Sequence, residues 1–181
     1  MQEPASLLLM YAVLPLWVAA GLVDWLCHRA TDIARTSGLK ENLLHLVMFA
    51  EIGAGMAAVA FLEIDGGVML AVIAVFVVHE LTVYWDLHYS TPLRYVGPFE
   101  QMVHSVLEML PLLSLALLAV IAWPQLNDVS LHAKTRPLPP AYLAGAAALV
   151  AAFNALPLLQ ETWSCWKARA KARTLPSPGP R

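Results

Sequence analysis

Residues 66–78 read GGVMLAVIAVFVV, and residues 79–89 continue as HELTVYWDLHY. The first segment has no charged side chain and is apolar enough to lie in lipid. Together the two segments are long enough for a helix that crosses the hydrocarbon core of a bilayer, about 30 Å. The second segment nevertheless ends this helix with four ionisable side chains: His79, Glu80, Asp86 and His88. Such side chains are either ordinary residues of the membrane interface or ligands for a bound group.

The composition of the whole chain is that of a membrane protein. Of the 181 residues, 59% are hydrophobic and 13% are charged, which excludes an ordinary soluble domain. The sequence predicts an all-α integral membrane bundle with one domain over residues 1–166 and a basic, Pro-rich cytoplasmic tail over 167–181. Five transmembrane helices are expected, near residues 6–28, 41–62, 67–88, 99–123 and 139–162.

The distribution of positive charge predicts the orientation of this bundle, because Lys and Arg concentrate in cytoplasmic loops. Lys134 and Arg136 fall on one side. The other nine of the eleven Lys and Arg residues fall on the opposite side: Arg29, Arg35, Lys40, Arg94, Lys167, Arg169, Lys171, Arg173 and Arg181. We therefore expect the N-terminus outside the cell (inner) membrane and the C-terminus in the cytoplasm. Cys27 and Cys165 then lie on the reducing side, where a disulfide is not expected.

Ionisable residues recur at helical spacing on four of the predicted helices. Residues four apart lie on one helix face, and residues seven apart nearly do so. Each of the four helices thereby presents a histidine and a carboxylate on a common face. The residues concerned are Asp24 and His28, Glu41 and His45 with Glu51 beyond them, His79 and Asp86, and Glu100, His104 and Glu108.

The predicted topology places all of these residues in the cytoplasmic half of the bundle. Glu51, His79 and Glu108 should lie roughly 15 Å from the cytoplasmic boundary, which is mid-bilayer depth. A charged side chain there costs at least about 2.5–3.5 kcal/mol, so these three require partners or a function. Residues at the boundary are explained equally well as solvated helix ends; these are His28, Glu41, His88 and Glu100.

The number of carboxylates in this predicted cluster indicates bound cations. Clustered carboxylates repel one another unless protons or cations compensate them, and no Lys or Arg is expected among them. Histidine and carboxylate without thiolate suit iron, manganese or zinc. We predict two divalent metal ions. Iron is the expected metal, and manganese and zinc are the alternatives. The predicted ligands are His28, His45, His79, His104, Asp24, Asp86, Glu108 and Glu51. Residues expected to support the ligands through hydrogen bonds are Glu41, Glu80, Glu100, Tyr84 and His88.

Two further features bear on this site. Pro111 follows Glu108 closely, and a proline inside a helix frees a backbone carbonyl and can open space beside the site. The fifth helix is rich in Ala and Gly and has no ionisable residue before Glu161, so the sequence predicts a purely structural role for it.

The segments ENLLH (41–45) and EQMVH (100–104), with histidines on four helices, carry a resemblance in architecture to ferritin-like di-iron carboxylate proteins. The motif of that family is Glu-x-x-His, whereas both segments here read Glu-x-x-x-His. The chain as a whole also weakly resembles multi-pass bacterial membrane proteins without an assigned activity. The resemblance implies a di-metal site between helices, embedded here in a membrane.

The function expected from these features is a di-iron oxidoreductase that acts on a lipophilic substrate or quinol with oxygen. No nucleotide-binding glycine motif appears, so the reductant would come from quinol, an electron-donor protein or a companion subunit; nucleic acid is not an expected partner. The alternatives are a metal-ion or proton transporter, a b-type cytochrome subunit, and a zinc-dependent membrane hydrolase. HELTV has Val83 where the zinc protease motif HExxH requires histidine, so that motif is excluded.

The predicted orientation is testable with reporter fusions at the C-terminus. A cytoplasmic reporter should be active there, because nine of the eleven basic residues lie on that side. Activity of a phosphatase that functions only outside the inner membrane would contradict the orientation and place the ionisable residues in the opposite half of the bilayer.

Overall fold

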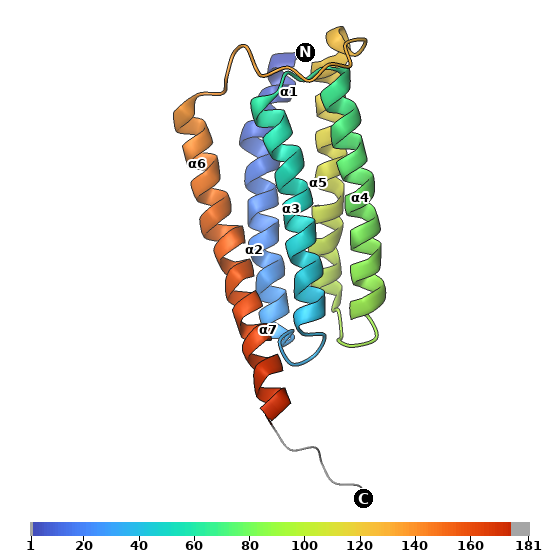
Figure 1. Ribbon diagram of the computed structural model, residues 1–181, viewed down its shortest axis with the longest axis vertical. Coiled ribbons are helices and arrows are strands. Elements are labelled where there is room, and N and C mark those ends of the chain that lie inside the picture. The colour runs from blue at the N-terminus through green and yellow to red at the C-terminus, as the bar shows by residue number, and fades with distance from the viewer. Residues whose placement is uncertain (1, 175–181) are drawn as a thin grey trace, which may run out of the picture.

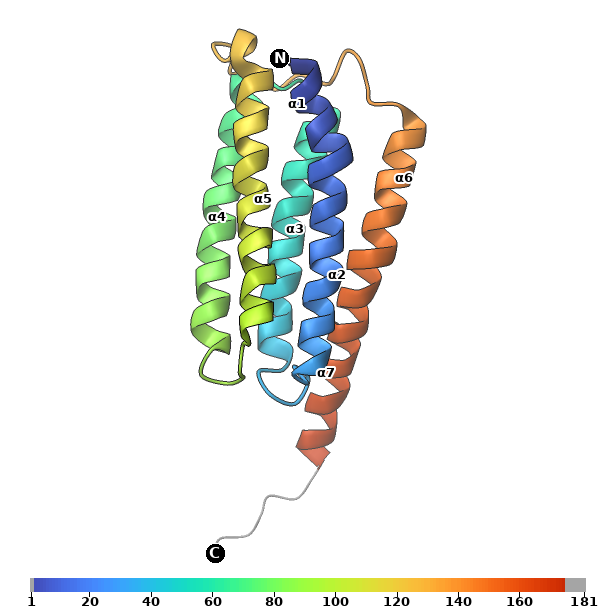
Figure 2. The ribbon, with the colours of Figure 1, turned by 180° about the vertical axis from the view of Figure 1, so that it is seen from behind.

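The computed structural model of the protein describes residues 2–174 as five long helices (Figures 1 and 2). All five are long and apolar enough to cross a membrane, which confirms the predicted all-helical fold with five spans. Over residues 2–174 there is no β-strand, only one isolated bridge between Leu62 and Ala133. The elements in chain order are α1 (Gln2–Leu8), η1 (Leu9–Val13), α2 (Leu14–Ala30), α3 (Leu39–Phe61), α4 (Gly66–Ser90), α5 (Pro98–Ala122), η2 (Trp123–Gln125), α6 (Pro140–Val150), η3 (Ala151–Ala155) and α7 (Leu156–Thr174).

The first and fifth helices each contain one π-helical segment, η1 and η3, directly before a proline. Pro15 and Pro157 have no N–H, and a proline ring clashes with the carbonyl four residues earlier. The residue before each proline, Leu14 or Leu156, donates its N–H to the carbonyl five residues back. The wider π turn accommodates the proline without ending the helix, so each membrane crossing stays continuous.

The fifth helix extends well beyond its predicted end near residue 162. It continues to Thr174 because residues 167–172 read KARAKA, all good helix formers. The basic side chains in its last turns also interact favourably with the C-terminal end of the helix dipole. The predicted tail therefore begins as helix, and its Pro-rich part, residues 175–181, lies outside the described residues.

The helices form a ring, and the fifth helix completes it. α3 packs against α4, α4 against α5 and α5 against α2, whereas α2 and α3 have few direct backbone contacts. α7 packs against both α2 and α3 in the half of the bundle away from the N-terminus (Figures 1 and 2). The prediction of a site inside a four-helix core needs correction here, because the fifth helix forms part of the wall around that half of the interior.

Apolar side chains fill the half of the bundle nearer the N-terminus. Met69, Leu118 and Ala122 are buried there. Further apolar residues pack against these three: Leu9, Val59, Ile64, Val72, Leu115 and Ala119. This apolar plug, as we call the nine residues, contains no polar side chain.

The connection between α5 and α6 covers the same end of the bundle. Its backbone at residues 126–130 approaches Gly66 and Gly67 so closely that a Cβ at either glycine would overlap carbonyl oxygens. Lys134 Nζ donates to the carbonyl of Leu62 at 2.9 Å and so satisfies a free carbonyl group at the end of α3. The loop therefore holds the α3–α4 turn in place.

Replacing Gly21 with Ala should loosen the contact between the first and fifth helices. A Cβ at Gly21 would overlap Nδ2 of Asn154, which donates to the carbonyl of Val18 at 3.2 Å. Loss of this buried hydrogen bond costs about 1–3 kcal/mol. For a chain of this size, Tm falls by roughly 2–4 °C per kcal/mol. Thermal unfolding of the purified protein in detergent measures the change.

Gly53→Ala is the matched control, because a Cβ at Gly53 meets no atom within 4 Å. Ala favours a helix over Gly by about 1 kcal/mol, so this variant should have an unchanged or higher Tm. An unchanged Tm in Gly21→Ala would show that the Asn154 contact does not hold the fifth helix.

Candidate metal centre

Three helices carry an acidic residue followed four positions later by a histidine. In each pair the histidine Nε2 faces a carboxylate oxygen: His28 and Asp24 at 3.5 Å, His45 and Glu41 at 3.8 Å, and His104 and Glu100 at 3.9 Å. Because α2 runs antiparallel to α5, the histidine of one pair also meets the carboxylate of the other. His104 Nε2 lies 3.0 Å from Asp24 Oδ1, and His28 Nε2 lies 3.8 Å from Glu100 Oε1.

The third and fifth helices and one loop complete this arrangement. α4 contributes Asp86, whose Oδ2 lies 3.6 Å from His45 Nε2. α7 contributes Glu161, and the loop between α4 and α5 contributes Arg94. We call the nine residues the polar cluster: Asp24, His28, Glu41, His45, Asp86, Arg94, Glu100, His104 and Glu161.

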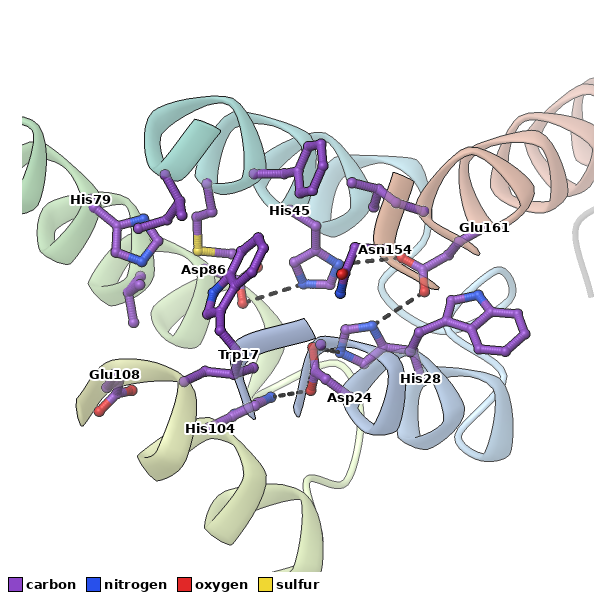
Figure 3. A pocket seen from close by; sticks show the side chains of 18 of the residues that line it. Trp17, Asp24, His28, His45, His79, Asp86, His104, Glu108, Asn154 and Glu161 are labelled. Atoms are coloured by element: carbon purple, nitrogen blue, oxygen red, sulfur yellow. Dashed lines mark hydrogen bonds and ion pairs between the residues drawn. The ribbon is translucent and has the colours of Figure 1, made fainter. Parts of the chain in front are cut away.

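Glu161 fixes the orientation of two imidazole rings. It accepts hydrogen bonds from His28 Nδ1 at 3.2 Å and from His45 Nδ1 at 3.3 Å (Figure 3). Asn42 Nδ2 donates to the same carboxylate at 2.9 Å. An ionised carboxylate only accepts hydrogen bonds, so both Nδ1 atoms carry their proton. The Nε2 atoms of His28 and His45 are then the nitrogens with a free lone pair in the neutral ring.

These Nε2 atoms face carboxylate oxygens rather than hydrogen-bond donors. His28 Nε2 is buried without a hydrogen-bond partner among the described residues, as are two carboxylate oxygens of the polar cluster: Glu41 Oε2 and Asp86 Oδ1. The rings of His28 and His45 also stack at 4.5 Å with an interplanar angle of 10°, so two imidazolium charges there would repel each other. Buried acceptor atoms without a donor are compatible with a bound cation.

The ligand-type atoms fall into two adjoining groups. One consists of Asp24, His28, Glu100 and His104, and the other of His28, Glu41 and His45. Within each group, one candidate atom per residue lies within 4.8 Å of all the others. The two groups share His28.

Arg94 links two of the carboxylates from the side of the loop. Its guanidinium donates to Glu41 Oε1 at 2.8 Å and also pairs with Glu100. The arginine side chain is 1% exposed. Burial by itself lowers the pKa of Arg94, yet the two carboxylates raise that pKa above its usual value, so the side chain stays charged. Arg94 corrects the expectation that no Lys or Arg lies among the carboxylates.

His79 and Glu51, both predicted as metal ligands, form a separate pair. His79 Nδ1 lies 3.2 Å from Glu51 Oε2, and Thr82 Oγ1 donates to Glu51 Oε1 at 2.8 Å. Neither residue belongs to the two groups of ligand-type atoms. The structure therefore brings three of the four predicted histidine ligands together and leaves the fourth with its own carboxylate.

A cavity of about 170 Å³ connects these two sets of residues. His79 and Glu108 line it together with Asp86, His45 and His104 of the polar cluster. Figure 3 shows His79 and Glu108 on the side of the cavity away from Glu161. The apolar lining consists mainly of Trp17, Met48, Phe49, Ile52, Val83 and Leu107. Leu107 is the residue four positions before Pro111, so its carbonyl lacks the usual helical donor next to the cavity.

Three of the residues predicted to support the ligands are not part of the cavity or the polar cluster. Tyr84 is 70% exposed and stacks on His88, which is also exposed, on the outer surface of α4. Glu80 is half-buried on the same helix and does not line the cavity. Glu41 and Glu100, by contrast, lie at the centre of the polar cluster.

Sequence reasoning missed Glu161, Asn42 and Arg94. The sequence predicts a purely structural fifth helix, but the structure shows that this helix also contributes a side chain to the polar cluster, since Glu161 contacts histidines of two other helices. The signal was present in the sequence, because Glu161 is the only acidic, basic or histidine residue between Pro140 and Trp166. Arg94 was counted only as a loop charge that sets the orientation, and no spacing rule linked it to Glu41.

No protein-family model matches the chain, and neither the curated proteins nor the solved structures contain a match. Any functional assignment therefore depends on the geometry of the polar cluster and the cavity.

Arg94→Gln should destabilise the protein strongly. Removing the guanidinium leaves Glu41 and Glu100 buried without their cationic partner, and breaking a buried pair in this way costs about 3–5 kcal/mol. Arg35→Gln is the control, because Arg35 pairs with Asp32 on the surface, where its side chain is 80% exposed and such a pair contributes about 0–1 kcal/mol. Thermal unfolding should show a large decrease in Tm for the first variant and none for the second.

A second variant tests the cause of that decrease. Adding Glu100→Gln to Arg94→Gln removes one of the two orphaned charges and should restore part of the lost Tm. If the double variant unfolds at a lower temperature than Arg94→Gln alone, the charge balance between these residues is not the reason.

Proposed function

We propose that this protein is a membrane-embedded enzyme with a dinuclear metal centre in the polar cluster. The observation that carries the proposal is the convergence of Nε2 atoms on carboxylate oxygens while Glu161 holds the opposite Nδ1 atoms. Metal-bound histidines commonly donate their second ring N–H to a carboxylate, which fixes the ring and strengthens the ligand. Glu161 does this for two histidines at once.

The charge balance supports two divalent ions. The polar cluster contains five carboxylates and one guanidinium, which leaves four negative charges if the histidines are neutral. Two divalent cations compensate these four charges. Full protonation of the three histidines would compensate only three, and it would place imidazolium rings face to face at 4.5 Å. Charges buried in an apolar bundle require compensation of this kind.

The donor atoms favour iron, with manganese and zinc as alternatives. The proposed ligands are the three Nε2 atoms of His28, His45 and His104 with oxygens of Asp24, Glu41, Asp86 and Glu100. This set contains no thiolate, although Cys165 is buried one turn from Glu161. Imidazole with carboxylate suits iron, manganese and zinc, and bundle-core di-iron sites are built from such side chains on facing helices.

The cavity beside the metal ligands supports an enzyme more than a transporter. It gives a small organic group access to Asp86, His45 and His104. Toward the N-terminal end the packed interior includes the apolar plug, which does not favour the passage of an ion there. The reaction we propose is the oxidation of a quinol, or the oxygenation of another lipophilic substrate, with molecular oxygen as the oxidant that is reduced to water. The protein would be integral to the inner membrane with the polar cluster in its cytoplasmic half, and a second protein or quinol would supply electrons.

Metal analysis of the purified protein tests this function. We expect about two iron (or manganese or zinc) atoms per chain, and an optical spectrum without the Soret band of haem. His45→Ala and His104→Ala should lose most of the metal. Glu161→Gln should reduce metal affinity about 10–100-fold. The amide of Gln is neutral and has only one acceptor oxygen, so it cannot replace the carboxylate that accepts from both Nδ1–H groups.

His88→Ala and His132→Ala are the controls, because one lies on the outer surface of α4 and the other in the α5–α6 loop, where it pairs with Ser130. Both should retain full metal content. Wild-type metal content in His45→Ala and His104→Ala, or a haem spectrum, would refute the dinuclear centre.

A further inference from the structure

The cavity between the polar cluster and His79 has polar groups at both ends and aromatic walls between them. Asp86, His45 and His104 line one end, and His79 and Glu108 line the other. Between them lie Trp17 and Phe49, whose rings stack at 6.3 Å with an interplanar angle of 16°. A cavity of about 150 Å³ is known to hold one benzene molecule, so the 170 Å³ here suits a single aromatic ring.

His79 presents a defined hydrogen-bonding group at the deep end. Its Nδ1 is engaged by Glu51 Oε2, and the other oxygen of Glu51 is fixed by Thr82. The side chain of His79 is 10% exposed, and its Nε2 has no hydrogen bond or ion pair among the described residues. A carboxylate on Nδ1 sets the tautomer and leaves Nε2 as an acceptor for an incoming hydroxyl group.

We infer that the cavity binds the hydroxylated aromatic ring of a lipophilic phenol or quinol, with the ring hydroxyl donating to His79 Nε2. The opposite edge of the ring then faces the proposed metal ligands. Only the chemistry at that edge rests on the proposed function; the binding itself does not require the metal.

Other occupants fit the same observations less well. A saturated acyl chain would offer no hydrogen-bond donor to His79 Nε2. A third metal ion would find one imidazole and one carboxylate already paired with each other. Two other ionisable groups lie at the His79 end of the cavity, Glu51 from α3 and Glu108 from α5. Asp86 lies two turns further along α4, at the end formed by the polar cluster.

The structure also explains why His79 would select a hydroxyl group. A buried acceptor that must be satisfied discriminates strongly against an analogue without the donor, whereas an apolar wall discriminates weakly between similar rings. The test therefore compares two ligands that differ only in this group.

The experiment measures binding of a fluorinated meta-decylphenol and of the corresponding fluorinated decylbenzene by fluorine NMR, with the full chain in detergent. The alkyl chain is meta to the hydroxyl group, so the edge of the ring opposite the hydroxyl stays free. We expect a saturable bound signal for the phenol and about fivefold weaker binding of the decylbenzene, since one net hydrogen bond contributes about 1 kcal/mol. His79→Leu should weaken phenol binding by about the same factor and leave decylbenzene binding unchanged.

His88→Leu is the matched control, since it changes a histidine of the same helix that faces outward. It should bind both ligands like the wild type. Equal affinity of the wild type for the two ligands, or wild-type phenol affinity in His79→Leu, would overturn the inference. If His79→Leu does not insert into the membrane, the comparison of phenol and decylbenzene affinities on the wild-type protein still tests the inference.

Metal content measured on the same samples separates this inference from the proposed function. A chelator-treated protein should retain the preference for the phenol. A protein that shows this preference but never holds metal would refute the dinuclear centre and leave the inference standing. A protein that holds two metal ions but binds both ligands equally would refute this inference and leave the dinuclear centre standing.

Discussion

The hydrogen bonds from His28 and His45 to Glu161 determine the chemistry of the whole interior. They assign the protons of two imidazole rings to Nδ1, and so they direct two Nε2 lone pairs toward Asp24, Glu41 and Asp86. Acceptors that face acceptors in an apolar bundle repel each other unless a proton or a metal cation lies between them. The buried guanidinium of Arg94 compensates part of this negative charge through its contacts with Glu41 and Glu100.

The fifth helix is what allows this arrangement. Glu161 reaches both histidines only because α7 closes the ring between α2 and α3. That position depends on a close approach at Gly21, where Asn154 of the π-helical segment η3 lies against the first helix. The π turn exists because Pro157 follows it. The missing N–H of Pro157 therefore helps to position the carboxylate of Glu161, which lies one turn further along the same helix.

The five spans and the three acid–histidine pairs could be predicted from the sequence, because both depend on local periodicity. Hydropathy gives the spans, and the i,i+4 spacing gives Asp24 with His28, Glu41 with His45 and Glu100 with His104. The partners of Glu161 could not be predicted, because they depend on which helices are neighbours and at what rotation. The same limit applies to His79, whose spacing from Asp86 placed both on one face. Two helical turns nevertheless separate them along the axis, about 10 Å, so they contact different residues.

That separation gives the interior two different chemical environments. At one end of the cavity, several carboxylates and imidazoles share a region with a single guanidinium, which suits cations. At the other end, His79 pairs with Glu51, which also accepts from the hydroxyl of Thr82, and Glu108 lines the cavity beside them. One nitrogen of His79 remains available there. The aromatic side chains that line the cavity favour a flat apolar ring. A ligand that fills the space would therefore be held at a hydroxyl group by His79 and would present its other edge to the polar cluster, which orients it before any reaction begins.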